Sequence, residues 1–324
     1  MRKKTITAAV AAAAAGVAAT VFSVGSASAT GAGSPVAAVR SRIAVHFDLA
    51  KGQMPENVAL SPRGTAYVTF AAARQVAAVT LAGTVRVLAT MAAPADGGSN
   101  TPVLKFALTT GIVRHDNGTL YFLYASGDAG STGLYRLRPG GTPQRIAALP
   151  ATGLPNGLAL DERTGTFYLT DSVLGTISTV PLGGGAATVW SSAPELAATG
   201  FLGANGIKVR HGAVWATNLD KGTLLRIPVR HGKPGAVQLK ASNLVGIDDI
   251  AFVGNGDEQV LAALNAPSTV VSIDAAGRAT TVLSAADGLQ NPTSVAVRGS
   301  SAYVLSAAYT TAKDPNLLLA TLPH

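Results

Sequence analysis

One pattern recurs six times along the chain and constrains its fold more than any other feature. Each copy has a polar residue, a short apolar strand, a turn containing Gly or Asn, and a second strand rich in aromatic or β-branched residues. In the third copy these strands are residues 156–160 and 166–170. The leading polar residues of successive copies lie 43 to 54 residues apart. Short strands at this spacing indicate an all-β repeat fold.

Each copy also supplies two further strands, which in the first copy are residues 75–81 and 84–88. Four strands in a unit of roughly 40–50 residues are typical of a propeller blade. The last copy ends one strand short, whereas the strand 42–47 precedes the first copy and has no blade of its own. We therefore predict a six-bladed β-propeller whose ring is closed by the N-terminal strand, which leaves no open sheet edge.

The N-terminus has the features of an export signal. Arg2, Lys3 and Lys4 precede a weakly apolar run at 6–24, which ends at a small-residue cleavage pattern, Ala27-Ser28-Ala29. We predict a signal peptide at 1–29, a flexible mature N-terminus at 30–40 and the propeller at 41–324, in a secreted protein. A retained membrane helix is the alternative, but the run is rich in Ala and no stop-transfer segment follows it.

Composition narrows the range of partners. The formal net charge is +8, but the basic residues are scattered and no basic run is interleaved with aromatic residues, so we expect no nucleic-acid partner. No second apolar stretch reaches membrane-spanning length, so we expect no span after signal cleavage. The chain has no cysteine. We expect a monomer that acts on a small molecule.

The residues that lead the six innermost strands should gather at one end of the central channel. All six carry a side-chain oxygen, and two of them are carboxylates. They are Glu56, Thr110, Asn156, Asn205, Asp248 and Thr293. Because the repeat register selects these positions without regard to their chemistry, their shared polarity suggests a common site.

Carboxylate and amide oxygens are the ligands that calcium prefers. We predict a calcium ion held by four of the ring residues, with another divalent cation as an alternative: Glu56, Asn156, Asn205 and Asp248. Zinc and copper favour imidazole or thiolate, and no His or Cys falls in the ring. Two alternatives stay open. The Asn-Gly pairs at 156–157 and 205–206 are also ordinary turn dipeptides, and Asp249 could be the ligand in place of Asp248.

The chain resembles the calcium-dependent six-bladed propellers of the senescence-marker-protein and gluconolactonase group, with diisopropyl-fluorophosphatases and paraoxonases as more distant relatives. The resemblance rests on the blade pattern and on four motifs, which are Pro55-Glu56-Asn57, Pro155-Asn156-Gly157, Asn205-Gly206 and Asp248-Asp249. It implies hydrolysis of a lactone or phosphoester at a calcium ion. Thr110 departs from the Asn or His that relatives can carry at its position.

Two functions follow as hypotheses. The first is a secreted, calcium-dependent hydrolase of the lactonase or esterase type, in which Asp248 activates water and Thr110 and Thr293 bind substrate. Tyr124, Asp171 and Asn218 follow second strands and could line the pocket, although a simple strand-end role is favoured. The second hypothesis is a non-catalytic secreted propeller of the NHL type that binds a ligand or protein partner, because fold does not fix function.

Overall fold

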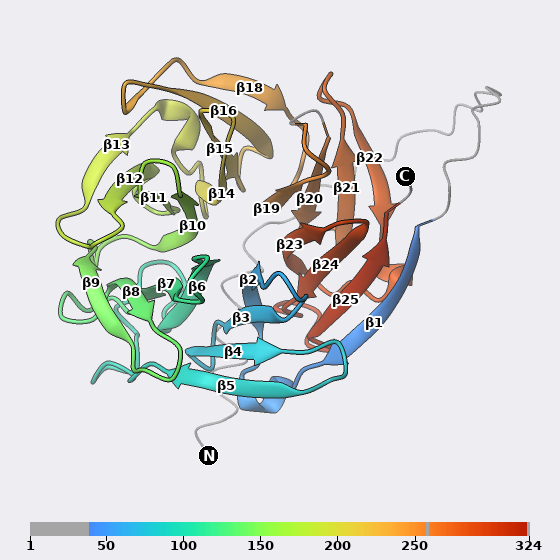
Figure 1. The fold of residues 1–324 in the computed structure, drawn as a ribbon, viewed down its shortest axis with the longest axis horizontal. Helices are drawn as coiled ribbons and strands as arrows, with labels where there is room; N and C mark the ends of the chain where they lie inside the picture. Colours follow the sequence, from blue (N-terminus) through green and yellow to red (C-terminus); the bar gives the residue numbers. More distant parts are fainter. Residues whose placement is uncertain (1–38, 257–258, 323–324) are drawn as a thin grey trace.

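Six antiparallel sheets surround a central axis in the computed structural model of the protein (Figure 1). The structure describes residues 39–256 and 259–322. The predicted all-β propeller and its six blades are confirmed. The predicted signal peptide at 1–29 and residues 30–38 of the predicted flexible segment lie outside the described residues.

The strands follow one another outward from the axis within each blade. Blade one contains β2 (Pro55–Leu60), β3 (Ala66–Phe70), β4 (Gln75–Val79) and β5 (Val85–Thr90). Blade two contains β6 (Leu108–Arg114), β7 (Leu120–Ala125), β8 (Gly133–Leu137) and β9 (Gln144–Ala148). Blade three contains β10 (Pro155–Asp161), β11 (Thr166–Asp171), β12 (Thr176–Pro181) and β13 (Thr188–Ser191).

The second half of the ring repeats this order. Blade four contains β14 (Ala204–Arg210), β15 (Ala213–Asn218), β16 (Thr223–Arg230), β18 (Gln238–Ala241) and the two-residue β17 (Lys233–Pro234). Blade five contains β19 (Ile247–Phe252), β20 (Val260–Leu264), β21 (Thr269–Ile273) and β22 (Ala279–Leu283). Blade six contains β23 (Pro292–Arg298), β24 (Ser301–Ser306), β25 (Asn316–Thr321) and β1 (Arg40–His46).

The N-terminal strand closes the ring, as predicted. β1 pairs antiparallel with β25 from Arg40 opposite Thr321 to His46 opposite Asn316, so the first and last strands of the described residues belong to one blade (Figure 1). Just beyond β1, the Phe47 ring packs edge-on against Phe70 of blade one at 5.0 Å between centroids. The closing strand is therefore held by backbone pairing in one blade and by apolar contact with the next.

Helical structure is limited to three short 3₁₀ turns in the described residues. They are η1 (Leu49–Lys51), η2 (Pro194–Leu196) and η3 (Ala285–Asp287). Within residues 39–256 and 259–322, no helix has the length and apolar character needed to cross a membrane.

Every innermost strand is irregular near its start. The pairing of each with the second strand of its blade shifts register, for example between Pro155 and Leu158 and between Ala204 and Ile207. Equivalent shifts occur in blades one, two, five and six. A bulge of this kind bends the strand and redirects its side chains. The bulges lie at the positions of the leading polar residues, so they set how those side chains meet at the axis.

Candidate metal centre

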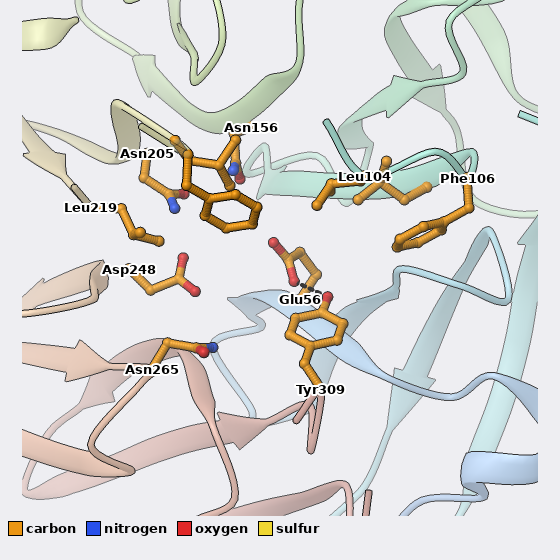
Figure 2. A pocket seen from close by; sticks show the side chains of 12 residues that line it. Glu56, Leu104, Phe106, Asn156, Asn205, Leu219, Asp248, Asn265 and Tyr309 are labelled. Atoms are coloured by element: carbon orange, nitrogen blue, oxygen red, sulfur yellow. Dashed lines mark hydrogen bonds between the residues drawn. The ribbon is translucent and has the colours of Figure 1, made fainter. Parts of the chain in front are cut away.

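All four predicted metal ligands line one cavity of about 80 Å³ at one end of the channel. Figure 2 shows their polar groups directed toward a common space. Each occupies the second position of an innermost strand. They are Glu56 on β2, Asn156 on β10, Asn205 on β14 and Asp248 on β19. The pseudo-symmetry of the blades thus brings together side chains that are far apart in the sequence.

The two Asn-Gly pairs lie in strands, so the structure contradicts the reading of them as turns. A Cβ on Gly206 would lie 2.5 Å from the backbone oxygen of Asp248, and a Cβ on Gly157 would clash with that of Asn205. Neither glycine has a positive φ. Glycine is therefore required by the close approach of the neighbouring blade, which carries the next ligand residue.

Threonine hydroxyls link the ligand residues of adjacent blades. Thr217 Oγ1 accepts a hydrogen bond from Gly206 N at 2.8 Å and donates one to Asp248 O at 2.7 Å. Thr170 makes the same pair of bonds with Gly157 N and Asn205 O. These hydroxyls satisfy backbone groups that the bulges remove from the sheet ladder. They also fix the relative position of consecutive ligands.

Thr110 and Thr293 do not line the cavity. Both are fully buried; Thr110 Oγ1 donates to Pro155 O at 2.8 Å and Thr293 Oγ1 donates to Pro55 O at 2.9 Å. Each hydroxyl therefore holds the backbone next to a ligand in the following blade. The predicted contact with substrate has no support in this geometry, because the hydroxyls are already engaged with backbone oxygens away from the cavity.

Two buried carboxylates face the cavity without a basic partner among the described residues. Glu56 is 8% exposed and Asp248 is 7% exposed. Burial raises the pKa of Glu56 to about 7, although the hydrogen bond from the Tyr309 hydroxyl opposes this rise. Burial, followed by the charge of Glu56, raises the pKa of Asp248 well above its usual value. Buried like charges of this kind need protons or a cation.

Asp249, unlike Asp248, does not line the cavity. Its carboxylate accepts a hydrogen bond from Lys208 Nζ at 2.6 Å and one from Ser294 Oγ at 2.7 Å. Asn57 Nδ2 lies 3.4 Å from the same carboxylate. Of the two adjacent aspartates, Asp248 is therefore the one that faces the cavity, while Asp249 is held inside the channel by an ammonium group.

The donor set around the cavity fits a hard divalent cation. The two carboxylates supply charge, and the amides of Asn156 and Asn205 supply neutral oxygens. Asn156 Nδ2 donates to Ser172 Oγ at 3.1 Å, which leaves its carbonyl oxygen for the cavity. Across the described part of the chain, no three His, Cys, Asp or Glu side chains form a metal-binding group. A cation here would therefore depend on the amide oxygens.

Two polar residues of the cavity, Tyr309 and Asn265, do not belong to the ring predicted from the sequence. Asn265 directly follows β20, the second strand of blade five. It lies one position beyond Leu264, which is the residue equivalent in register to Asp171 and Asn218, so the strand-end rule does not reach it. Tyr309 lies in the loop after β24, and no repeat register reaches it.

The three strand-end residues considered from sequence have structural roles. Tyr124 donates to Ala92 O, and Asp171 Oδ1 accepts from the backbone of Leu154. Asn218 Nδ2 donates to Glu195 O. None of them lines the cavity. The favoured strand-end interpretation of these residues is therefore correct.

Comparisons with known proteins agree with the fold. No family model and no curated protein matches the sequence. A gluconolactonase from Xanthomonas campestris is similar in structure, with a TM-score of 0.65, 14% identity, and 89% of this chain and 91% of that chain covered. A calcium-binding protein, regucalcin, from Agrobacterium tumefaciens is similar with a TM-score of 0.64 and 17% identity, and 88% of this chain and 94% of that chain are covered. A virginiamycin B lyase from Staphylococcus aureus is similar with a TM-score of 0.58 and 12% identity, and 88% of this chain and 99% of that chain are covered.

The gluconolactonase and the regucalcin belong to the group that the sequence motifs resemble, so this resemblance is supported at the level of the fold. At these low identities the likeness establishes the propeller architecture. The lyase has the same architecture under a different enzyme name, which illustrates that one fold serves several activities. The chemistry of this chain therefore depends on the side chains of its own cavity.

Proposed function

We propose that the protein is a secreted, calcium-dependent hydrolase of lactones or related esters. The observation that carries the proposal is the pair of buried carboxylates, Glu56 and Asp248, which face a cavity beside two amide side chains and have no basic partner among the described residues. The structural likeness to a gluconolactonase and to a calcium-binding regucalcin supports the same function.

The four polar side chains would hold the cation, and when bound it would polarise a substrate carbonyl as a Lewis acid. Glu56 is fixed by the hydrogen bond from Tyr309, which suits a ligand that keeps its position. Asp248, the other carboxylate at the cavity, would accept the proton of the attacking water. Without a cation, burial and the charge of Glu56 raise the pKa of Asp248. The amide of Asn265, at the edge of the same cavity, opposes this rise in the pKa of Asp248.

A panel of lactones and aryl esters, assayed with calcium and with a chelator, tests the proposal. We expect turnover that the chelator abolishes, and a loss of roughly 100-fold or more in kcat/KM for Asp248→Asn. Glu56→Gln should weaken calcium binding and activity together. Glu162→Gln is a matched control, because this carboxylate lines a separate pocket that the ring residues do not share.

Two outcomes would overturn the proposal. If Glu56→Gln and Asp248→Asn retain full activity and calcium affinity, the site is elsewhere. If calcium binds but no lactone or ester turns over, the protein is better described as a propeller that binds a ligand or protein partner without catalysis, the alternative inferred from sequence.

Secretion is part of the proposal and has its own test. The basic start, apolar run and Ala27-Ser28-Ala29 pattern support export with cleavage after Ala29. Intact mass and N-terminal sequencing of protein recovered from the medium should give a chain that begins at Thr30. Recovery of the full-length chain from the cell alone would contradict export.

A further inference from the structure

The walls of the cavity differ sharply from its polar floor. Beside the carboxylates and amides, the lining consists of large apolar side chains, five of them from loops and one from the start of β6. They are Leu104, Phe106, Leu108, Phe201, Leu202 and Leu219. In Figure 2, Leu104 and Phe106 lie on one side of the acidic pair and Leu219 lies on the other. A ligand held at the polar floor would therefore have these apolar side chains beside it.

The apolar walls belong to one packed cluster. Phe106, Leu108 and Leu202 are buried within it, and Leu104, Phe201 and Leu219 pack against it. The cluster unites loops between β5 and β6, between β13 and β14, and after β15. Side chains that pack on one another in this way present a fixed surface, so the walls are a formed part of the site.

Hydrogen bonds fix the loop that carries Phe201. The Asp220 carboxylate accepts from four consecutive backbone amides, those of residues 199–202, at 2.7 to 3.1 Å. On the opposite wall, Leu104 lies between Val103 and Lys105, whose φ angles are +60° and +61°. A β-branched residue rarely adopts that conformation, so the chain holds Leu104 in place at a local conformational cost.

We infer that the site accepts a small lactone or ester whose substituents are apolar, alkyl or aryl, in preference to a polyhydroxylated sugar lactone. This inference rests on the proposed function and names its substrate class. The floor groups suffice for a cation and a reacting ester, and the Tyr309 hydroxyl already donates to Glu56. Hydroxyl groups on the rest of the ring would face Leu and Phe side chains and lose their water without gaining partners.

Three lactones of one ring size test the inference by turnover. They are δ-valerolactone without a substituent, δ-nonalactone with a butyl group, and glucono-1,5-lactone with hydroxyls. We expect kcat/KM for δ-nonalactone to exceed that for glucono-1,5-lactone by roughly tenfold or more. Equal values, or a preference for the sugar lactone, would overturn the inference and leave the proposed hydrolase function standing.

Binding of the corresponding lactams separates the two claims, because lactams resist hydrolysis. Calorimetry with butyl-substituted δ-valerolactam and with gluconolactam should give tighter binding of the butyl compound. If no lactone turns over but this preference holds, the inference stands as a statement of ligand class and the hydrolase proposal fails. If neither lactam binds and no lactone turns over, both fail.

Two wall variants locate the preference. Leu219→Asn and Phe201→Ala should each raise KM for δ-nonalactone roughly fivefold or more while changing that for δ-valerolactone less. Calcium affinity measured on the same samples should stay unchanged, which shows that each variant is folded. Leu239→Asn is the matched control, since Leu239 is 61% exposed on β18. Wall variants that leave the ratio of the two KM values unchanged would contradict the inference.

Discussion

At the scale of single residues, the three carboxylates of the channel differ in whether a basic side chain is paired with them. Asp249 is paired with Lys208, whereas Glu56 and Asp248 face the cavity without a basic partner among the described residues. The Lys208 side chain is 29% exposed and that of Asp249 only 2%. The Lys208 ammonium therefore neutralises Asp249, which does not line the cavity. The charges of Glu56 and Asp248 remain available to a bound ligand.

Removal of this ammonium should be costly. Lys208→Met would leave Asp249 buried and unpaired, and we expect a loss of about 3–5 kcal/mol in the free energy of unfolding, measured by urea denaturation. In the Lys208→Met variant, the additional change Asp249→Asn should restore part of the lost free energy of unfolding. Lys51→Met removes the exposed pair with Asp48 and should cost less than about 1 kcal/mol. Similar losses in the two single variants would show that the buried pair is unimportant.

The raised pKa of Glu56 predicts how stability depends on pH without calcium. Because its carboxyl holds its proton more tightly when folded, Glu56 stabilises the fold below about pH 4.5, and this contribution is lost as pH rises through about 7. Asp248 acts in the same direction. With chelator present, the melting temperature of the wild type should fall across this window relative to that of Glu56→Gln. If the melting temperatures of the wild type and Glu56→Gln changed in parallel with pH, the raised pKa of Glu56 would be contradicted.

At the scale of strands, the bulge at the start of each innermost strand builds the site. In blades three and four, a threonine hydroxyl from the second strand satisfies the backbone groups that the bulge exposes, and a glycine lets the next blade approach. The sequence pattern places the ligand residues correctly because it follows the repeat. It could not reveal the bulges, since Asn-Gly has the same appearance in a turn and in a bulged strand.

Gly206→Ala tests this arrangement. The added methyl would lie 2.5 Å from Asp248 O, so the ligand strand must shift. We expect at least a tenfold loss of calcium affinity, or about 1.4 kcal/mol, by calorimetry. Gly183→Ala is the control, because a Cβ there meets nothing within 4 Å and its φ is not positive. An unchanged affinity in Gly206→Ala would mean that the close approach does not position Asp248.

At the scale of the whole molecule, the repeat count and the spare N-terminal strand were sufficient to predict six blades and their closure. The cavity walls were not predictable, because Leu104, Phe201 and Tyr309 lie in loops of unequal length that share no register. Repeats specify what recurs around the axis. The side chains that distinguish one propeller site from another lie in the segments that do not recur.

Closure predicts the effect of truncation. A chain that begins at residue 48 lacks β1 and exposes the edge of β25, whereas one that begins at residue 39 retains the closed ring. We expect the shorter chain to unfold at lower urea concentration and to aggregate, because an unpaired edge strand recruits other chains. Equal midpoints and equal solubility would show that β1 does not close the ring in solution.

The central claim is that one cation is shared by four blades, and a calcium titration of chelator-treated protein by calorimetry tests it most directly. We predict one calcium ion per chain, with binding abolished in Glu56→Gln/Asp248→Asn and weakened in Asn156→Ala and in Asn205→Ala, while Glu162→Gln binds as the wild type does. Absence of binding to the wild type, or equal binding by the wild type and the double variant, would contradict the account.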